Sequence, residues 1–191
     1  MDRIAETEKI CPEAGPHLFR PGLKKISVPV LLLLGLAAFL LGAQAVKRLG
    51  LMPGKSYNLA VPADRHWIDT GFDVKRDQVL HVRASGMISL QRGNPMAYCG
   101  PDGYKDLKTV QQPLQKHNIG ALIGKVVLLL SVEEDEETGE EIRHELIEFF
   151  YVGEENRIQM PIDGQLFLGI NELVTEDNGG RFQVEMRLDP E

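Results

Sequence analysis

The segment Phe182-Gln-Val-Glu-Met-Arg-Leu188 alternates apolar side chains with polar or charged ones. A period of two is typical of a β-strand with one face on a hydrophobic core and the other in water, because successive side chains of a strand point to opposite faces. We therefore predict a half-buried strand over residues 182–188, close to the end of a chain of 191 residues.

Shorter segments of the same kind precede it, and each is bounded by Gly, Pro, Asn or Asp. They are Trp67–Phe72, Val79–Ala84, Met87–Leu90 and Gln165–Ile170. After Arg48 no long segment has helical periodicity. Several short strands separated by turn residues are typical of an antiparallel β-sandwich, so we predict an all-β domain. We expect Trp67 to pack in its core rather than to stack on a ligand.

Two further strands are predicted on either side of an acidic turn. Residues 121–132 and 142–152 are rich in β-branched and aromatic side chains. Between them the acids gather around Thr138 and Gly139: Glu133, Glu134, Asp135, Glu136, Glu137, Glu140 and Glu141. Their mutual repulsion favours an extended, solvated tip, and glycine permits a tight turn. We interpret the segment as a hairpin tip; a weak cation site or a docking point for a basic partner is the alternative.

The N-terminal region contains an apolar stretch from Ile26 to Val46 without a charged residue. About 20 such residues span the hydrocarbon of a bilayer, so we predict one transmembrane helix. The small residues of Ala43-Gln-Ala45 also suit signal peptidase, and a signal peptide cleaved near Ala45 is the alternative. Both readings place the following domain in the periplasm or outside the cell.

These features divide the chain into four parts. Residues 1–25 form a leader expected in the cytoplasm, and residues 26–46 form the membrane anchor or signal segment. Residues 47–63, with Pro53 and Gly54, are interpreted as a linker. Residues 64–191 form the β-sandwich.

Composition excludes several classes of function. The net charge of −7 does not suit the phosphate backbone, so we expect no nucleic-acid partner. Two cysteines, Cys11 and Cys99, cannot form a disulfide framework or a four-thiolate zinc site. No nucleophile elbow or phosphate-binding glycine loop occurs, and we expect the protein not to be an enzyme.

An oxygen-rich loop lies between two predicted strands, at residues 171–180. Its side-chain oxygens come from Glu172, Thr175, Glu176, Asp177 and Asn178, followed by two glycines. Carboxylate, amide and carbonyl oxygens are the ligands that Ca²⁺ takes. An ordinary hairpin turn with the sequence Asp-Asn-Gly-Gly is the alternative.

Five segments, in order and spacing, resemble the small bacterial calcium-dependent galactose-binding lectins of the PA-I type over most of residues 67–188. They are Trp67-Ile-Asp-Thr-Gly71, Leu80-His-Val-Arg-Ala-Ser-Gly86 leading to Leu90, Gly100-Pro-Asp-Gly103, Gly120-Ala-Leu-Ile-Gly124, and Gly164-Gln-Leu-Phe-Leu-Gly-Ile-Asn171 with Asp177-Asn-Gly-Gly-Arg-Phe182. The resemblance implies a jelly-roll-like sandwich of the galactose-binding-domain kind. It also implies Ca²⁺ held between loops at one end, where the ion bridges to vicinal sugar hydroxyls.

Residue by residue, the resemblance implies a calcium site formed by Leu90 (through its carbonyl), Glu172, Thr175, Asp177 and Asn178. It implies sugar contacts from Glu172, Asp177 and Asn178. The family has Asp where this chain has Glu172, and Asn where it has Asp177; metal binding should tolerate these changes better than sugar specificity.

We therefore expect an exported, membrane-anchored module that binds a galactose-like carbohydrate through Ca²⁺. The alternative is a structural or protein-interaction β-sandwich of the cell envelope with a vestigial sugar site. Assembly into a homo-oligomer stays open.

Overall fold

The computed structural model describes residues 48–110 and 112–190, all of them in strands, turns and loops. The predicted leader and membrane segment, residues 1–46, lie outside the described residues. Within the described ranges no helix is long and apolar enough to cross a membrane.

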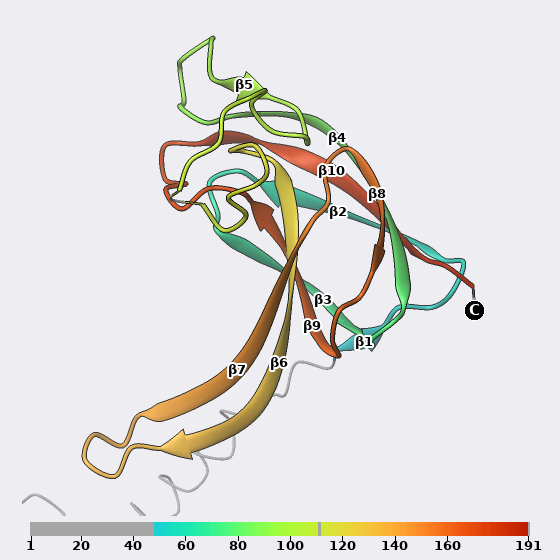
Figure 1. The fold of residues 1–191 in the computed structure, drawn as a ribbon, viewed down its shortest axis with the longest axis vertical. Helices are drawn as coiled ribbons and strands as arrows, with labels where there is room; N and C mark the ends of the chain where they lie inside the picture. Colours follow the sequence, from blue (N-terminus) through green and yellow to red (C-terminus); the bar gives the residue numbers. More distant parts are fainter. Residues whose placement is uncertain (1–47, 111, 191) are drawn as a thin grey trace, which may run out of the picture. The chain divides into compact units, whose positions relative to one another are not determined.

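Ten strands form two sheets that pack face to face (Figure 1). One sheet has the order β1-β3-β9-β6-β7: β1 (Leu49–Gly50), β3 (Trp67–Val74), β9 (Gly164–Ile170), β6 (Leu122–Glu134) and β7 (Glu141–Tyr151). The other has the order β2-β10-β4-β5, and β8 also pairs with β4: β2 (Ser56–Pro62), β10 (Gly179–Leu188), β4 (Val79–Ser89), β5 (Tyr98–Cys99) and β8 (Glu155–Gln159). All strand pairs are antiparallel except β1 with β3, so the predicted all-β sandwich is confirmed.

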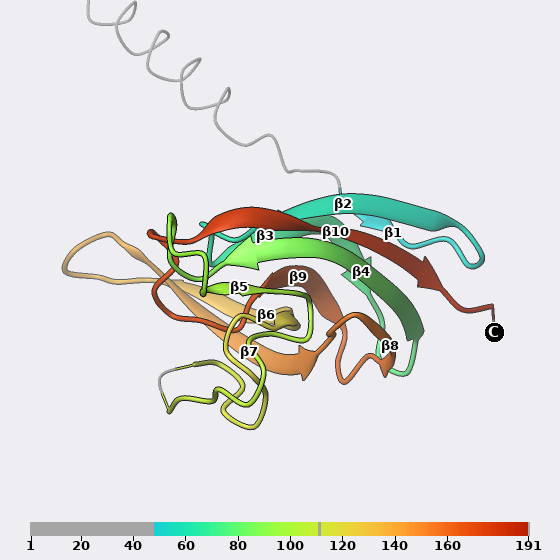
Figure 2. The same cartoon turned by 90° about the horizontal axis from the view of Figure 1, so that it is seen from above.

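The core lies between the two layers, which Figure 2 shows from above with β2, β10 and β4 over β9 and β6. From β10 the inward side chains are those that the alternation predicted, Phe182, Val184, Met186 and Leu188, each at most 3% exposed. Leu122, Val126, Leu166, Leu168 and Ile170 belong to the same cluster from the opposite sheet. Burial of one such side chain stabilises a fold by about 1.5–3 kcal/mol, so these two inner faces hold the sandwich together.

The sandwich begins before residue 64, inside the segment whose composition predicted a linker. Strand β2 pairs with β10 along its length, and Val61 and Ala63 are fully buried. Pro53 and Gly54 form a turn whose Gly54 nitrogen donates to the Leu188 carbonyl at 2.9 Å. Local composition alone predicts a spacer here. The contacts that stabilise the segment as a strand come from β10, more than a hundred residues later, and a local reading of the sequence does not include them.

Two predicted segments, 79–84 and 87–90, form the single strand β4. Gly86 joins them with a φ of 101°, in the left-handed region that favours glycine. A Cβ at this position would lie 2.9 Å from the carbonyl oxygen of Arg181 on β10. Glycine therefore allows the two strands to approach where any other residue would push them apart.

Trp67 lies on the outer face of its sheet, so the prediction that it packs in the core is wrong. Its cross-strand neighbour is Gly169, and its ring packs against Phe149 with 5.7 Å between ring centroids. The ammonium group of Lys125 lies 4.6 Å from the Trp67 ring centroid. Period two assigns a strand's two faces but does not say which face is inward when both are apolar.

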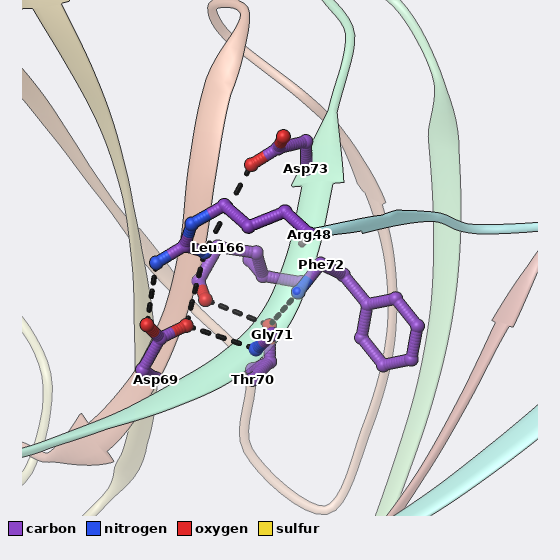
Figure 3. Close-up of polar contacts among 7 residues, drawn as sticks. All are labelled: Arg48, Asp69, Thr70, Gly71, Phe72, Asp73 and Leu166. Atoms are coloured by element: carbon purple, nitrogen blue, oxygen red, sulfur yellow. Dashed lines mark hydrogen bonds and ion pairs between the residues drawn. The ribbon is translucent and has the colours of Figure 1, made fainter. Parts of the chain in front are cut away.

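Arg48, the first described residue, is fixed to an irregular part of β3 (Figure 3). Its guanidinium forms a two-pronged ion pair with Asp69 and lies 3.8 Å from the Asp73 carboxylate. In the same bulge the Thr70 hydroxyl donates to the Leu166 carbonyl at 2.7 Å. Arg48, which lies in the segment predicted to be a linker, is thus part of the folded domain.

The hairpin of β6 and β7 extends beyond the sandwich, as Figure 1 shows. Strand β9 pairs only with residues 122–127 of β6, and from Leu128 onward β6 pairs with β7 alone. We call residues 128–147 the arm. At its tip Asp135 accepts hydrogen bonds from the nitrogens of Glu137 and Thr138, which lower the pKa of its carboxyl. The predicted acidic hairpin tip is confirmed.

Candidate functional site

The oxygen-rich loop lies where β4 ends and β10 begins. Gly179 pairs with Ser89 in the sheet register. The next residues of the two strands stay together, since the Arg92 nitrogen donates to the Asp177 carbonyl at 2.7 Å and the Arg92 guanidinium donates to the Asn178 carbonyl at 2.8 Å. The segment that follows Leu90 therefore lies directly beside Asp177 and Asn178. We call this part of the molecule the loop end.

Asn178 is the most constrained residue of the loop end. It is fully buried, and its side-chain nitrogen donates to Glu172 Oε2 at 2.6 Å and to the Ala63 carbonyl at 3.3 Å. These two acceptors set the orientation of the amide. Its oxygen, Oδ1, is buried and has no hydrogen-bond partner, the one such side-chain atom within residues 48–110 and 112–190. Leaving an acceptor in this state costs about 1–3 kcal/mol.

Glu172 supplies the carboxylate beside this amide. Burial raises the pKa of its carboxyl and the negative charge of Asp177 raises it further, whereas the hydrogen bond from Asn178 lowers it. A bound cation would favour the ionised form that burial disfavours.

The other two predicted ligands have different environments. Thr175 is buried, its nitrogen donates to Glu176 Oε2 at 3.1 Å, and its carbonyl accepts from the Asn178 nitrogen at 3.1 Å. Asp177 is exposed, and its carboxylate is at the surface while its carbonyl is bonded to Arg92. The structure thus brings Glu172 and Asn178 into contact and places Asp177 beside the segment that follows Leu90. Thr175 contributes hydrogen bonds through its backbone nitrogen and carbonyl.

A site built only from carboxylates, histidines or thiolates does not fit here. Across the described part of the chain, no group of three or more His, Cys, Asp or Glu side chains is placed to hold a metal ion. The loop end offers instead two carboxylates, one free amide oxygen and backbone carbonyls. This mixed oxygen set suits a hard cation such as Ca²⁺ at modest affinity, because affinity rises with the number of carboxylate ligands.

Asn171 has a structural role that the sequence did not reveal. Its buried amide accepts from the Leu114 nitrogen at 2.9 Å and donates to the carbonyls of Leu114 and Asn118, both at 3.0 Å. It therefore fastens the long loop between β5 and β6 to the end of β9. The signal was a polar residue directly after a buried strand, which is ambiguous because such a residue more often begins a surface turn.

The same long loop carries His117, whose ring stacks on Tyr151 with 4.3 Å between centroids. Burial lowers the pKa of His117, and the positive charge of Lys108 lowers it further. The Tyr151 hydroxyl donates to Asp102 Oδ1 at 2.7 Å. The lowered pKa favours the neutral form of this imidazole.

Cys99 does not provide a reactive thiol. It is buried, and burial together with the negative charge of Glu172 raises the pKa of its thiol to about 12. Nucleophilic attack requires the thiolate, so this cysteine packs as a small apolar residue.

No protein-family profile and no curated protein matches this chain. Among solved structures it is similar to one described as "EclA N-terminal domain; PllA-like lectin", with 19% sequence identity and a TM-score of 0.47. The match covers 70% of this chain and 96% of that one. At this identity and TM-score the likeness does not indicate which ligand this chain binds, and the ligand has to be inferred from its own residues.

Proposed function

We propose that the protein is a carbohydrate-binding module that holds a galactose-like sugar through Ca²⁺ at the loop end. The observation that carries the proposal is the buried, unpartnered Oδ1 of Asn178 next to the Glu172 carboxylate. A cation would satisfy that oxygen and offset the burial of the carboxylate at the same time.

The residues that would hold the ion are Glu172, Asp177 and Asn178, with the carbonyls of Leu90 and Thr175. Bound Ca²⁺ would supply open coordination positions for vicinal hydroxyl groups of a sugar. Glu172 and Asp177 would orient those hydroxyls by accepting hydrogen bonds, and Asn178, whose amide is buried and already donates to Glu172 and Ala63, would act on the sugar through the ion. With two carboxylates, we expect a Kd of about 10⁻⁴–10⁻³ M for Ca²⁺, the range of weak extracellular calcium modules.

Calorimetry of the full-length chain in detergent, titrated with CaCl₂, tests the metal. Asp177→Ala should weaken calcium binding at least about tenfold, because charge on the ligands sets affinity. Glu140→Ala, which removes one acid from the tip of the arm, is the matched control. Weaker calcium binding by Glu172→Asp would mean that the longer Glu side chain is adapted to this loop. Stronger calcium binding would mean that Glu172 weakens the site. Absence of calcium heat in the parent chain would refute the proposal.

A glycan array run with and without Ca²⁺ tests the sugar. We expect calcium-dependent signal on galactose-terminated glycans. Calcium binding without any glycan signal would mean that the ion stabilises the fold and that the protein is not a lectin.

Export and anchoring are part of the same proposal. The apolar stretch Ile26–Val46 would hold the module at the outer side of a membrane. Fractionation of cells should recover the intact chain with membranes, and a product starting at Val46 would indicate a cleaved signal peptide instead. Intact chain in the soluble cytosol would exclude both.

The second candidate function is protein interaction, and the arm favours it. Leu130, Val132, Ile142 and Leu146 are each at least 40% exposed, and β7 is an edge strand of its sheet. A long, apolar edge strand is a template for pairing with another chain. The seven acids at the tip oppose insertion into a bilayer, because burying charge in hydrocarbon is costly.

The occupant we favour is the β7 strand of a second copy. Antiparallel pairing centred on Leu146 places His144 of each copy opposite Glu148 of the other and Ile142 opposite Phe150, without opposing like charges. Such a contact is symmetric about a twofold axis, with the same residues contributed by each copy. It would also stabilise the arm, because an isolated two-stranded hairpin is only marginally stable.

Cysteine cross-linking tests this register in the full-length Cys11→Ser chain, where Cys99 is buried. Leu146→Cys should form a disulfide-linked dimer rapidly on oxidation. Ile142→Cys on the same strand is the control, because the two copies of residue 142 would lie roughly 27 Å apart at about 3.4 Å per residue. Equal rates for the two variants would exclude the register.

A further inference from the structure

Three basic side chains lie side by side on the outer face of the sheet that contains β10. Arg187 of β10 pairs in register with His81 of β4, and His81 pairs with Arg157 of β8. Directly opposed residues in neighbouring strands share a face and lie about 4.5–5.5 Å apart, so Arg187 and Arg157 flank His81 on one face and carry charge of the same sign. An arrangement of this kind needs negative charge nearby.

A groove of about 700 Å³ adjoins this row. Lys75 and Arg76, from the turn between β3 and β4, line it together with His81, Arg157 and Arg187. We call these five residues and the space between them the basic groove. Val79, Leu188 and Pro190 contribute its apolar wall. The groove lies at the C-terminal end of β10, opposite the loop end, in a chain whose net charge is −7.

The acids around the groove are already engaged. Glu155 accepts from His81 and from Arg83, both at 2.9 Å, and Asp189 pairs with Arg157. Asp77 accepts from the Gln159 amide at 2.7 Å. Within residues 48–110 and 112–190, the side chains of Lys75, Arg76 and Arg187 form no ion pair. Asp77 and Asp189 also line the groove, so its four lysine and arginine side chains leave a net charge of about +2 there, and three of the four have no direct ion-pair partner among the described residues.

We propose that the basic groove binds a sulfate or phosphate group carried by a small organic molecule. Tetrahedral dianions match this set because they offer several acceptor oxygens to the arginine forks and to the lysine ammonium. The groove is larger than a single anion and within the 300–1,000 Å³ typical of small-ligand sites, so the apolar wall has room for the rest of the molecule. This site is separate from the proposed calcium site and does not depend on it.

Calorimetry of the full-length chain at low ionic strength, with a calcium chelator present, tests the proposal. The probes are inorganic sulfate, inorganic phosphate, a hexose 6-sulfate, a hexose 6-phosphate and the unmodified hexose. We expect the esters to bind more tightly than the free ions, the unmodified hexose to give no heat, and binding to weaken as NaCl is raised. Equal affinity for ester and free ion would show that the apolar wall does not take part and would overturn the organic-ligand part of the proposal.

Two variants with the same change of charge make the test specific. Arg187→Gln should weaken ester binding about fivefold to tenfold, as expected for loss of one charge-assisted contact at a partly exposed site. Arg181→Gln changes an exposed arginine on the same face of β10 at the loop end and should leave binding unchanged. Equal weakening in both variants would mean attraction to net charge alone, and absence of heat with every probe would refute the site.

Discussion

The two ends of strand β10 differ in how their polar groups are held. At Gly179, the loop end buries amides and half-buries a carboxylate among fixed hydrogen bonds, and one acceptor remains without a partner among the described residues. At Leu188, the basic groove keeps its cations at the surface with few partners. Changes at the loop end should therefore alter the stability of the fold, whereas changes at the groove should alter ligand binding and leave the fold intact. The predictions below test that contrast.

The largest effect is expected for Asn171→Ala at the loop end. The substitution removes three buried hydrogen bonds and leaves the Leu114 nitrogen without its partner, while the Leu114 and Asn118 carbonyls keep other donors. We expect a loss of about 2–4 kcal/mol in the free energy of unfolding, measured by urea denaturation. Asn58→Ala on the exposed face of β2 is the control and should change stability by less than about 0.5 kcal/mol. Similar losses in both would mean that the loop end is no more constrained than the surface.

Calcium should give the next largest effect. At ten times its Kd, a ligand that binds only the folded state adds about 1.4 kcal/mol to the free energy of unfolding. Thermal unfolding in CaCl₂ should show that gain in the parent chain and not in Asp177→Ala. Arg187→Gln should keep the full gain, since the groove lies at the other end of β10. A gain that Asp177→Ala retains would place the ion elsewhere.

The pH dependence of stability should report Glu172. Because its pKa is raised in the folded state, the folded chain holds this proton more tightly than the unfolded chain. Without calcium, the contribution of Glu172 to stability should be fully present below the unfolded pKa of about 4.5 and should be lost as the pH rises through the folded pKa. Glu172→Gln keeps an acceptor for Asn178 without the buried charge. At pH 7 the free energy of unfolding of Glu172→Gln should exceed that of the parent chain by under about 1 kcal/mol. Denaturation between pH 4 and 8 measures the pH dependence of this free energy for both chains. Greater stability of the parent chain at pH 7 would contradict the argument.

The smallest effect concerns the row of like charges at the groove. Arg187→Gln relieves repulsion with Arg157 on the same face, so stability should stay equal or rise by about 0.2–0.5 kcal/mol. Urea denaturation at low salt measures this change, and added NaCl should reduce it. A loss above about 1 kcal/mol would show that Arg187 supports the fold rather than a ligand.

Most of the strands were predictable because their stabilising contacts leave a local pattern. The alternation in residues 182–188 and the apolar runs around the acidic turn each identify a strand from a few neighbouring residues. β2 and β8 escaped prediction because Ser56–Pro62 and Glu155–Gln159 are short and mixed in composition. Their place in the fold comes from pairing with β10 and β4, which no local window contains.

The candidate sites show the same division. The resemblance and the density of oxygens pointed to residues 172–178, but the free Oδ1 of Asn178 and the fastening role of Asn171 depend on Ala63 and Leu114, far away in the chain. The basic groove had no signal in the sequence, because Lys75, His81, Arg157 and Arg187 are scattered among acids. Only strand register brings them together.

By itself, the sequence determined that the domain is built of strands, which faces of β10 are dry and wet, and that the acidic residues 133–141 form a hairpin tip. Each of these follows from contacts or repulsions between residues close in the chain. The tertiary structure alone decided which strands are neighbours. It also decided that, among residues 48–110 and 112–190, no third strand pairs with the β6–β7 arm and one buried amide oxygen has no partner. These depend on long-range packing, where the geometry of two sheets, and not local preference, sets which groups meet and which are left over.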